Sequence, residues 1–440
     1  MPSIFQSYWR DEAFSVLLVQ KPFLEIIRIA AQDFSPPLYF LVLKIWTALF
    51  GYSEVATRSL SFVFFILTLG TMYLLLTHIT KIHRWILLCT VLILGFVHPL
   101  LTTNAFEARM YTMAAWLATL SWYFLLRKKW RWYALATLAG LYTHYFMILI
   151  VGTQAAYILV KNFPQRRTIA QLMKENLSSV VFFCVPILLF IPWVLLFFAS
   201  HNFDGPTSFW IPKPTLTNLL TIPSTITFGH DSFAHFKFDM WPFSLLVYGI
   251  LLITYFQKPK STQIVFFPFI MWTFVPGVVV WVMSQLTTSL FWPRYLIVST
   301  PGLVLLLVVC IFSLKPISKV VFFTLTLYLV ASYMLTTTQF VKTGNIFIST
   351  KENLRSHIEK IKETAEPADY LAVESELDYH VAQVYWFSAE QVKIVGKTYE
   401  EIPDYVGKSM IPKTAILTQP YQEVQGYILK QDRSIEKLSP

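Results

Sequence analysis

Long apolar runs separated by short polar loops dominate the first 340 residues of this 440-residue chain. The segments SLSFVFFILTLGTMYLLLT from Ser59 and SSVVFFCVPILLFIPWVLLFFAS from Ser178 have the length of about 17–25 residues that carries a helix across a bilayer. The segment from Ser178 forms a span near 178–199, and similar runs lie near 241–256, 264–283, 297–313 and 320–339. We therefore predict an all-α polytopic membrane protein with about ten transmembrane helices.

Basic loops divide these runs and restrict how they fold. The 42 residues between Arg84 and Arg127 are enough for two crossings, with an outer turn at Asn104–Tyr111. Only 29 residues separate Arg131 from Lys161. Because both flanks are basic, we expect a hairpin of two short helices that turns near Thr143–Phe146. The alternative is one long tilted helix.

The two ends of the chain have a different pattern. Residues 1–57 are predicted to form the first external loop, with amphipathic helices in FLEIIRIAAQDFSPPLYFLVLKIWTALF lying in the membrane interface. An upstream transmembrane helix is expected to be missing. Residues 58–340 then form the transmembrane domain. In residues 341–440 a helical spacing at Leu354, Ile358 and Ile361, with the strand-like segments DYLAVES, VKIVG and TAILTQ, predicts a small α/β domain.

Composition and charge agree with a membrane protein and orient it. Hydrophobic residues make up 55% of the chain and charged residues 14%, whereas soluble domains carry about a quarter charged residues. The net charge of +10 is concentrated in short loops, which argues for cytoplasmic loops and against nucleic-acid binding. The acidic pair Asp11–Glu12 and the C-terminal domain are then expected on the extracytoplasmic side of the cell membrane.

No metal-binding or nucleotide-binding motif stands out in the sequence. Cys89, Cys184 and Cys310 lie inside apolar runs, so we expect neither a disulfide nor a metal site from them. The His230, Asp231 and His235 group is interpreted as a solvated loop. We predict no metal ligands, and dependence on a divalent metal stays open.

Several short motifs occur in a characteristic order. They are the Asp11–Glu12 pair, PPLY from Pro36, FGYSEVATRSLS from Phe50, EARMYTM from Glu107, YTHYF from Tyr142 and FWPRYLI from Phe291. Together they resemble the GT-C integral-membrane glycosyltransferases, in the branch of the dolichyl-phosphate-mannose–protein mannosyltransferase-like family (glycosyltransferase family 39), which is similar to the lipid A aminoarabinose transferases.

This resemblance implies an inverting transfer of a sugar from a polyprenyl-phosphate carrier to an acceptor hydroxyl at the outer membrane face. Such a reaction requires a base for the acceptor proton and positive charge for the leaving phosphate. Asp11 matches the first-loop aspartate of the family and is the candidate base, although a solvated carboxylate at a helix start is the simpler alternative. Glu12 is the second candidate catalytic residue, and a capping role suits it equally well.

Arginines near the outer helix ends are candidates for the carrier phosphate. They are Arg58, Arg109 and Arg294, for which the alternative is snorkelling toward lipid headgroups. For Arg109, an ion pair with Glu107 or Asp11 is a further alternative. Candidate residues for binding the sugar or the acceptor are Asp33, Glu107, His144, Tyr145 and Tyr295. Ser35 stands where many relatives carry a histidine, and a serine supplies no positive charge there.

Two other functions suit the same apolar composition: a transporter or flippase for lipid-linked sugars, and a catalytically inactive membrane scaffold. A transporter places charged groups near the bilayer midplane, whereas the acids here are predicted at outer ends and loops. The expected partners are membrane lipids, a polyprenyl-phosphate sugar as the donor substrate, and an acceptor that is a protein, a glycolipid or a cell-wall glycan. No cofactor is certain.

Overall fold

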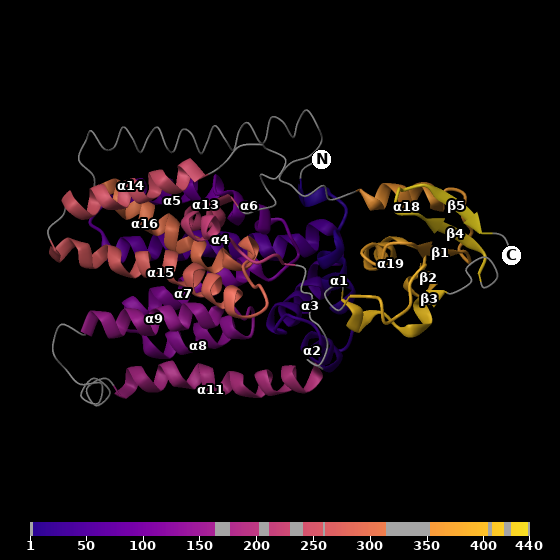
Figure 1. The fold of residues 1–440 in the computed structure, drawn as a ribbon, viewed down its shortest axis with the longest axis horizontal. Helices are drawn as coiled ribbons and strands as arrows, with labels where there is room; N and C mark the ends of the chain where they lie inside the picture. The colour runs from indigo at the N-terminus through magenta and orange to yellow at the C-terminus, as the bar shows by residue number, and fades with distance from the viewer. Residues whose placement is uncertain are drawn as a thin grey trace. The chain divides into compact units, whose positions relative to one another are not determined.

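Figure 1 shows a computed structural model of the chain. It describes residues 3–162, 177–201, 211–228, 241–257, 260–313, 353–403, 407–417 and 424–438. The His230–His235 loop and the span expected near 320–339 lie outside these residues. Internal contacts separate the chain into two units. The first comprises Met1–Leu60, Glu107–Arg109 and Thr350–Pro440, and the second comprises Ser61–Phe106 and Met110–Ser349.

Short helices begin the first unit: η1 (Ser3–Phe5), α1 (Arg10–Leu18), α2 (Phe23–Gln32) and α3 (Leu38–Phe50). Pro22 directly precedes α2. Backbone N–H groups at a helix start have no partner within the helix, so a proline, which lacks this group, costs no helical hydrogen bond there. Pro36 and Pro37 separate α2 from α3, and Gly51 ends α3 with a φ of +83°. The helices predicted within Phe23–Phe50 are therefore confirmed, and the two prolines lie between them.

The C-terminal part of the first unit is a five-stranded sheet with the order β3-β2-β1-β4-β5. Its strands are β1 (Tyr370–Val373), β2 (Val392–Val395), β3 (Ile416–Leu417), β4 (Gly426–Leu429) and β5 (Ile435–Leu438). Only the β4–β5 pair is antiparallel. The remaining elements are α18 (Leu354–Lys362), α19 (Tyr379–Tyr385), η4 (Ala389–Gln391), η6 (Lys408–Met410) and η7 (Lys413–Ala415). The predicted α/β domain and its first three strands are confirmed.

Gly426 marks a close approach of two strands. Its φ is +152°, and a Cβ built at this position would overlap the backbone carbonyl of Tyr370 on β1. Only glycine lets β4 start beside β1 at this register, in which Tyr370 pairs with Gly426.

One hydrophobic core joins the two ends of the chain within the first unit. Tyr8, Ala13 and Val16 from the α1 region belong to the same buried cluster as Ile358 of α18 and Tyr379 of α19. The strand residues that face this cluster alternate with a smaller set on the other sheet face, which is Ala372, Val395, Leu417, Ile428 and Leu438. The α1 region and the C-terminal domain therefore form one folded body.

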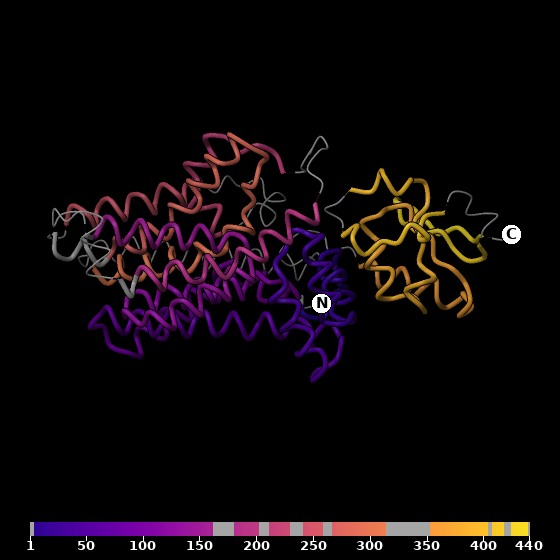
Figure 2. Tube along the Cα trace, turned by 90° about the horizontal axis from the view of Figure 1, so that it is seen from below, coloured from indigo at the N-terminus to yellow at the C-terminus, as the bar shows by residue number. Residues whose placement is uncertain are grey.

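The second unit is a bundle of helices that run alongside one another in Figures 1 and 2. Its elements include α4 (Glu54–Ile79, which starts in the first unit), α5 (Arg84–Phe96), α6 (Pro99–Ala105), α7 (Tyr111–Leu126), α8 (Trp130–Leu141), α9 (Met147–Asn162) and α11 (Leu177–Ser200). They continue with α12 (Leu216–Leu220), α13 (Ile222–Phe228), α14 (Trp241–Gln257), α15 (Lys260–Leu286), η3 (Pro293–Ser299) and α16 (Thr300–Ser313).

In the described part of the chain, four helices are long and apolar enough to cross a bilayer. A fifth is added if α5 and α6, which bend by 75° at their junction, form one span. This supports a multi-pass membrane protein, while the count of about ten helices stays a prediction. The short-helix hairpin is confirmed, since α8 and α9 contact each other and are separated by Tyr142–Phe146. The alternative of one long helix is wrong.

A tryptophan pair lies in the core of this bundle. The rings of Trp122 on α7 and Trp272 on α15 stack at 5.5 Å, and Trp272 Nε1 donates to the Val298 carbonyl at 2.7 Å. A Cβ at Gly302 on α16 would lie 2.8 Å from Trp272 Cγ. Glycine therefore allows α16 to pack directly against the buried indole.

Candidate active site

Glu12 and Arg58 form a fully buried ion pair in the first unit. Arg58 Nε donates to Glu12 Oε1 at 2.8 Å and Nη2 donates to Oε2 at 2.7 Å, and both side chains have 0% exposure. The Ala108 N–H also donates to Glu12 Oε1, at 2.9 Å, and the Trp9 N–H donates to Oε2 at 3.4 Å. The carboxylate of Glu12 thus caps α1 and connects it to α4 and to the turn Glu107–Tyr111, called the EARMY turn below.

The rest of the Arg58 guanidinium binds backbone carbonyls of the N-terminal segment. Nη1 donates to Ile4 at 3.0 Å and to Gln6 at 2.7 Å, and Nη2 donates to Ser7 at 3.1 Å. An arginine has five N–H donors, and these contacts together with the pair to Glu12 use five. This arrangement favours a structural role for Arg58 over the phosphate-binding role that its motif implies.

Asp11 lies one residue before Glu12, in the first turn of α1. Its carboxylate receives a 3.2 Å ion pair from Arg10 Nε, with side-chain exposures of 23% and 27%. A carboxylate in a first helical turn is stabilised by the helix dipole. The acidic pair is therefore divided, with Glu12 buried and Asp11 partly open to solvent.

The EARMY turn places a third charged group next to Asp11. Arg109, which is 7% exposed, donates from Nη1 to Ser15 Oγ at 3.2 Å and to the Asp11 backbone carbonyl at 3.3 Å. Its guanidinium lies 6.0 Å from the centre of the Phe40 ring. Glu107 is 2% exposed in the same turn, and its carbonyl accepts the Arg109 N–H. The turn that holds Glu107 and Arg109 thus contacts α1 at Asp11 and Ser15, more than 90 residues away in sequence.

Asp33 and Ser35 lie at the junction of α2 and α3. Asp33 ends α2, where its N–H donates to the carbonyls of Ile29 and Ala30. Ser35 is 4% exposed, directly before the two prolines. The sugar-binding or acceptor-binding role of Asp33 stays a prediction.

Four other predicted residues gather in the second unit. Arg294 and Tyr295 lie in the first turn of η3, and the Arg294 guanidinium is 5.5 Å from the centre of the Tyr111 ring. Tyr295 stacks on Tyr111 at 6.5 Å and lies 5.8 Å from the ring of His144. His144 Nδ1 accepts the Phe146 N–H at 3.1 Å, so a neutral His144 carries its proton on Nε2.

Tyr145 belongs to the same turn between α8 and α9, but it faces another helix. Its hydroxyl accepts a hydrogen bond from Trp193 Nε1 of α11 at 3.1 Å, and its ring lies 5.5 Å from Phe197. Tyr295 and His144 therefore belong to an aromatic cluster, and the guanidinium of Arg294 lies over the Tyr111 ring of the same cluster. Flat aromatic faces and a guanidinium are suited to sugar rings and phosphates.

Two residues that contact the predicted arginines, Ser15 and Tyr111, were not among the site residues predicted from the sequence. Ser15 positions Arg109, and its place one helical turn after Asp11 was a usable signal, because residues four apart share a helix face. Tyr111 underlies Arg294, and its position within EARMYTM was a second signal. Among the described residues, no three His, Cys, Asp or Glu side chains are arranged to hold a metal ion.

Comparison with known proteins gives a structural likeness without a sequence match. No sequence model of a protein family matches the chain, and no curated protein matches it significantly. The crystal structure of ArnT from Cupriavidus metallidurans in the apo state aligns with a TM-score of 0.62 at 12% identity, over 97% of this chain and 89% of that chain. The form bound to undecaprenyl phosphate aligns with a TM-score of 0.60 at 12% identity, over 97% and 90%.

A more distant likeness is to the archaeal oligosaccharyltransferase AglB from Archaeoglobus fulgidus, in complex with an inhibitory peptide and a dolichol-phosphate. It has a TM-score of 0.50 at 10% identity, and the alignment covers 97% of this chain and 66% of that chain. At these identities the likeness concerns the fold.

Proposed function

The chain has the fold of the GT-C integral-membrane glycosyltransferases, and from this premise we propose that it is a polyprenyl-phosphate-sugar-dependent glycosyltransferase. In this proposal it moves a hexosyl or pentosyl group to an acceptor hydroxyl at the outer membrane face, with inversion at the anomeric carbon. The acceptor class is a protein, a glycolipid or a cell-wall glycan. The first external loop and the C-terminal domain lie on the extracytoplasmic side.

The observation that carries this proposal is the unequal environment of Asp11 and Glu12. Glu12 is neutralised and immobilised by Arg58, whereas the Asp11 carboxylate keeps 23% exposure on the same helical turn. A general base has to be held rigidly and yet reach a substrate proton. The buried pair supplies the rigidity, and the partial exposure of Asp11 supplies the access.

The chemistry follows from these groups. The Asp11 carboxylate accepts the proton of the acceptor hydroxyl while that oxygen forms a bond to the anomeric carbon. The bond between the anomeric carbon and the phosphate oxygen breaks, and both of its electrons leave with the polyprenyl phosphate. Arg109 is positioned beside Asp11 and stabilises the charge that develops on this phosphate.

We retain the roles that the motifs imply for the second unit: Arg294 for the phosphate, and His144, Tyr145 and Tyr295 for the sugar or acceptor. We likewise retain Asp33 and Glu107 as sugar-binding or acceptor-binding candidates. A lipid-linked donor is supported by the bound molecules in the fold relatives, which are undecaprenyl phosphate in one and a dolichol-phosphate in another. The proposed donor class for this chain is accordingly a polyprenyl-phosphate sugar.

The test compares purified full-length wild type with Asp11→Asn. Each protein is incubated with a panel of polyprenyl-phosphate sugars and candidate acceptors, and release of polyprenyl phosphate is measured. Loss of a general base lowers the rate by about 100- to 10,000-fold. Glu25→Gln is the matched control, because Glu25 on α2 makes only a 3.8 Å ion pair with Lys21 and is 43% exposed.

The expected result is that Asp11→Asn lowers the transfer rate to this extent while thermal stability and donor binding stay at the wild-type level. Glu25→Gln should keep wild-type turnover. If Asp11→Asn and wild type release carrier phosphate at equal rates, Asp11 is not the base. If wild type moves lipid-linked sugar across liposomes without breaking the phosphate bond, the chain is a transporter.

A further inference from the structure

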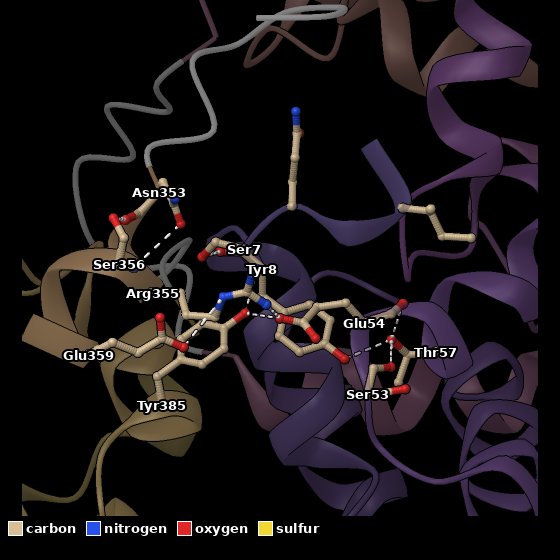
Figure 3. A network of polar contacts seen from close by, with 12 residues as sticks. Ser7, Tyr8, Ser53, Glu54, Thr57, Asn353, Arg355, Ser356, Glu359 and Tyr385 are labelled. Carbon is tan, nitrogen blue, oxygen red and sulfur yellow. Dashed lines mark hydrogen bonds and ion pairs between the residues drawn. The ribbon is translucent and has the colours of Figure 1, made fainter. Parts of the chain in front are cut away.

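A tyrosine of the C-terminal domain is hydrogen-bonded to the chain just before α1. The hydroxyl of Tyr385, at the end of α19, accepts the backbone N–H of Tyr8 at 2.8 Å (Figure 3). The same hydroxyl donates to Glu54 Oε1 at 2.8 Å. The rings of Tyr385 and Tyr8 also stack, with centroids 6.1 Å apart and planes inclined by 27°. One side chain thus connects the segment before α1 and the start of α4 to a helix that is more than 300 residues away from both in sequence.

A second residue of that domain reinforces the contact. Arg355 of α18 donates from Nη1 to the same Glu54 oxygen at 2.8 Å, with side-chain exposures of 26% for Arg355 and 16% for Glu54. Glu54 begins α4, the helix that carries Arg58. Figure 3 shows Arg355 and Tyr385 converging on Glu54 from the C-terminal domain.

Tyr8 is held from the other side as well. Its hydroxyl lies 2.8 Å from Thr57 Oγ1 and 2.8 Å from the Tyr52 carbonyl, and its ring faces the Arg58 guanidinium at 5.3 Å. Burial raises the pKa of both Tyr8 and Tyr385, so both hydroxyls stay protonated and able to donate at neutral pH. The backbone and side chain of Tyr8 are therefore fixed by separate partners.

These contacts bear on Asp11 because the chain between them is short. Trp9 is the N-cap of α1, Asp11 occupies its second position, and the contacts of Tyr8 set the direction in which the helix starts. A displacement of about 1 Å in a reacting group can lower an enzymatic rate about 100-fold. Contacts made by the C-terminal domain therefore control the position of the proposed base.

We propose that the C-terminal α/β domain acts as a positioning element for the proposed active site, with Tyr385 and Arg355 as positioning residues that hold α1, and so Asp11, through Tyr8 and Glu54. This inference rests on the proposed glycosyl transfer for its kinetic consequence. Its structural half, the restraint of the segment before α1, is independent of any activity.

The key variant is Tyr385→Phe, which keeps the ring that stacks on Tyr8 and removes the hydroxyl that joins Tyr8 to Glu54. Tyr370→Phe on β1 is the matched control, because the same substitution is made in the same domain at a ring that contacts Lys393 at 5.6 Å. Amide hydrogen exchange of peptides that cover residues 3–14 is measured in full-length protein. We expect Tyr385→Phe to accelerate exchange of the Tyr8 amide at least about 10-fold and Tyr370→Phe to leave it unchanged.

The kinetic half uses the transfer assay. Tyr385→Phe is expected to lower kcat about 10- to 100-fold while the KM for the donor changes less than about twofold. Arg355→Gln should likewise lower kcat with little change in the KM for the donor. Arg355→Lys keeps a positive charge beside Glu54 and should retain most of the wild-type kcat. In an Asp11→Asn background, Tyr385→Phe should lower turnover no further, because it acts through Asp11.

Exchange of peptides from residues 424–438 and the thermal transition report whether the domain is still folded in each variant. Wild-type exchange at Tyr8 in Tyr385→Phe overturns the proposal, and so does faster exchange with unchanged kcat. A third outcome separates the two proposals. If the wild-type protein transfers no sugar but Tyr385→Phe still accelerates exchange of the Tyr8 amide, the proposed function is refuted, and the restraint of the segment before α1 by Tyr385 is established.

Discussion

The buried pair between Glu12 and Arg58 makes a sharp prediction about stability. Four N–H donors point at the Glu12 carboxylate, which are two from Arg58, one from Ala108 and one from Trp9. In Glu12→Gln the amide NH₂ group faces at least one of these donors. In Arg58→Met the carboxylate loses its countercharge in a site with 0% exposure, and the carbonyls of residues 4, 6 and 7 lose their donor.

Removing one partner of a buried ion pair costs about 3–5 kcal/mol, because the remaining charge is left desolvated. For a folded unit of this size, each kcal/mol lowers the transition temperature by roughly 2–4 °C. Each single substitution is thus expected to lower the transition of the first unit by roughly 6–20 °C. In the double variant Glu12→Gln/Arg58→Met neither charge is left unpaired. Its loss of unfolding free energy should therefore be smaller than the sum of the two single losses by about 2 kcal/mol or more.

The assay is thermal unfolding of full-length protein in detergent, with hydrogen exchange of residues 4–12 to assign the transition to the first unit. Arg10→Met is the matched control, because the ion pair of Arg10 with Asp11 is partly exposed and such pairs contribute less than about 1 kcal/mol. A transition of Arg58→Met within about 1 °C of wild type, or strictly additive effects in the double variant, would refute this reasoning.

Two glycine substitutions test the close packing in each unit. Gly426→Ala brings a Cβ against the backbone of the neighbouring strand and should destabilise the C-terminal domain by about 2 kcal/mol or more, seen as faster exchange in β4. Gly396→Ala also has a positive φ of 77° but meets nothing within 4 Å, so it should cost only about 1–2 kcal/mol. Gly302→Ala should lower the thermal transition of the helical bundle by overpacking against Trp272, at a cost of about 1–3 kcal/mol. Gly249→Ala, which also meets nothing within 4 Å, should be neutral or stabilising; a Gly302→Ala protein as stable as that control would show that the indole can move.

The motif around Asp11 illustrates how far sequence reasoning could reach. An acidic pair, taken with the ordered motifs that follow it, was enough to select Asp11 and Glu12 as candidates and to relate the chain to the GT-C fold. It did not distinguish the two carboxylates, because both occupy the same helical turn. Their difference in burial arises from Arg58 and Ala108, which lie 46 and 96 residues away.

The roles of the three arginines also could not be assigned from the sequence. Arg58, Arg109 and Arg294 were all candidates for the carrier phosphate on the basis of charge and place in the motifs, with Arg58 and Arg294 ahead of Arg109. In the folded chain Arg58 uses its donors on Glu12 and on backbone carbonyls, Arg109 lies next to Asp11, and Arg294 lies over Tyr111. Hydrogen-bond partners decide the role of a guanidinium, and those partners come from distant segments.

The sequence by itself determined the local elements of this protein: the apolar spans, the proline-separated helices before Gly51, the short hairpin before Lys161 and three strands of the C-terminal domain. Each is encoded in periodicity, in helix ends and in proline or glycine positions within a window of about 20 residues. Only the tertiary structure decided that the C-terminal domain shares a core with α1 and reaches it through Tyr385. That pairing depends on shape and on single hydrogen bonds between residues 377 positions apart, and no local pattern carries this information.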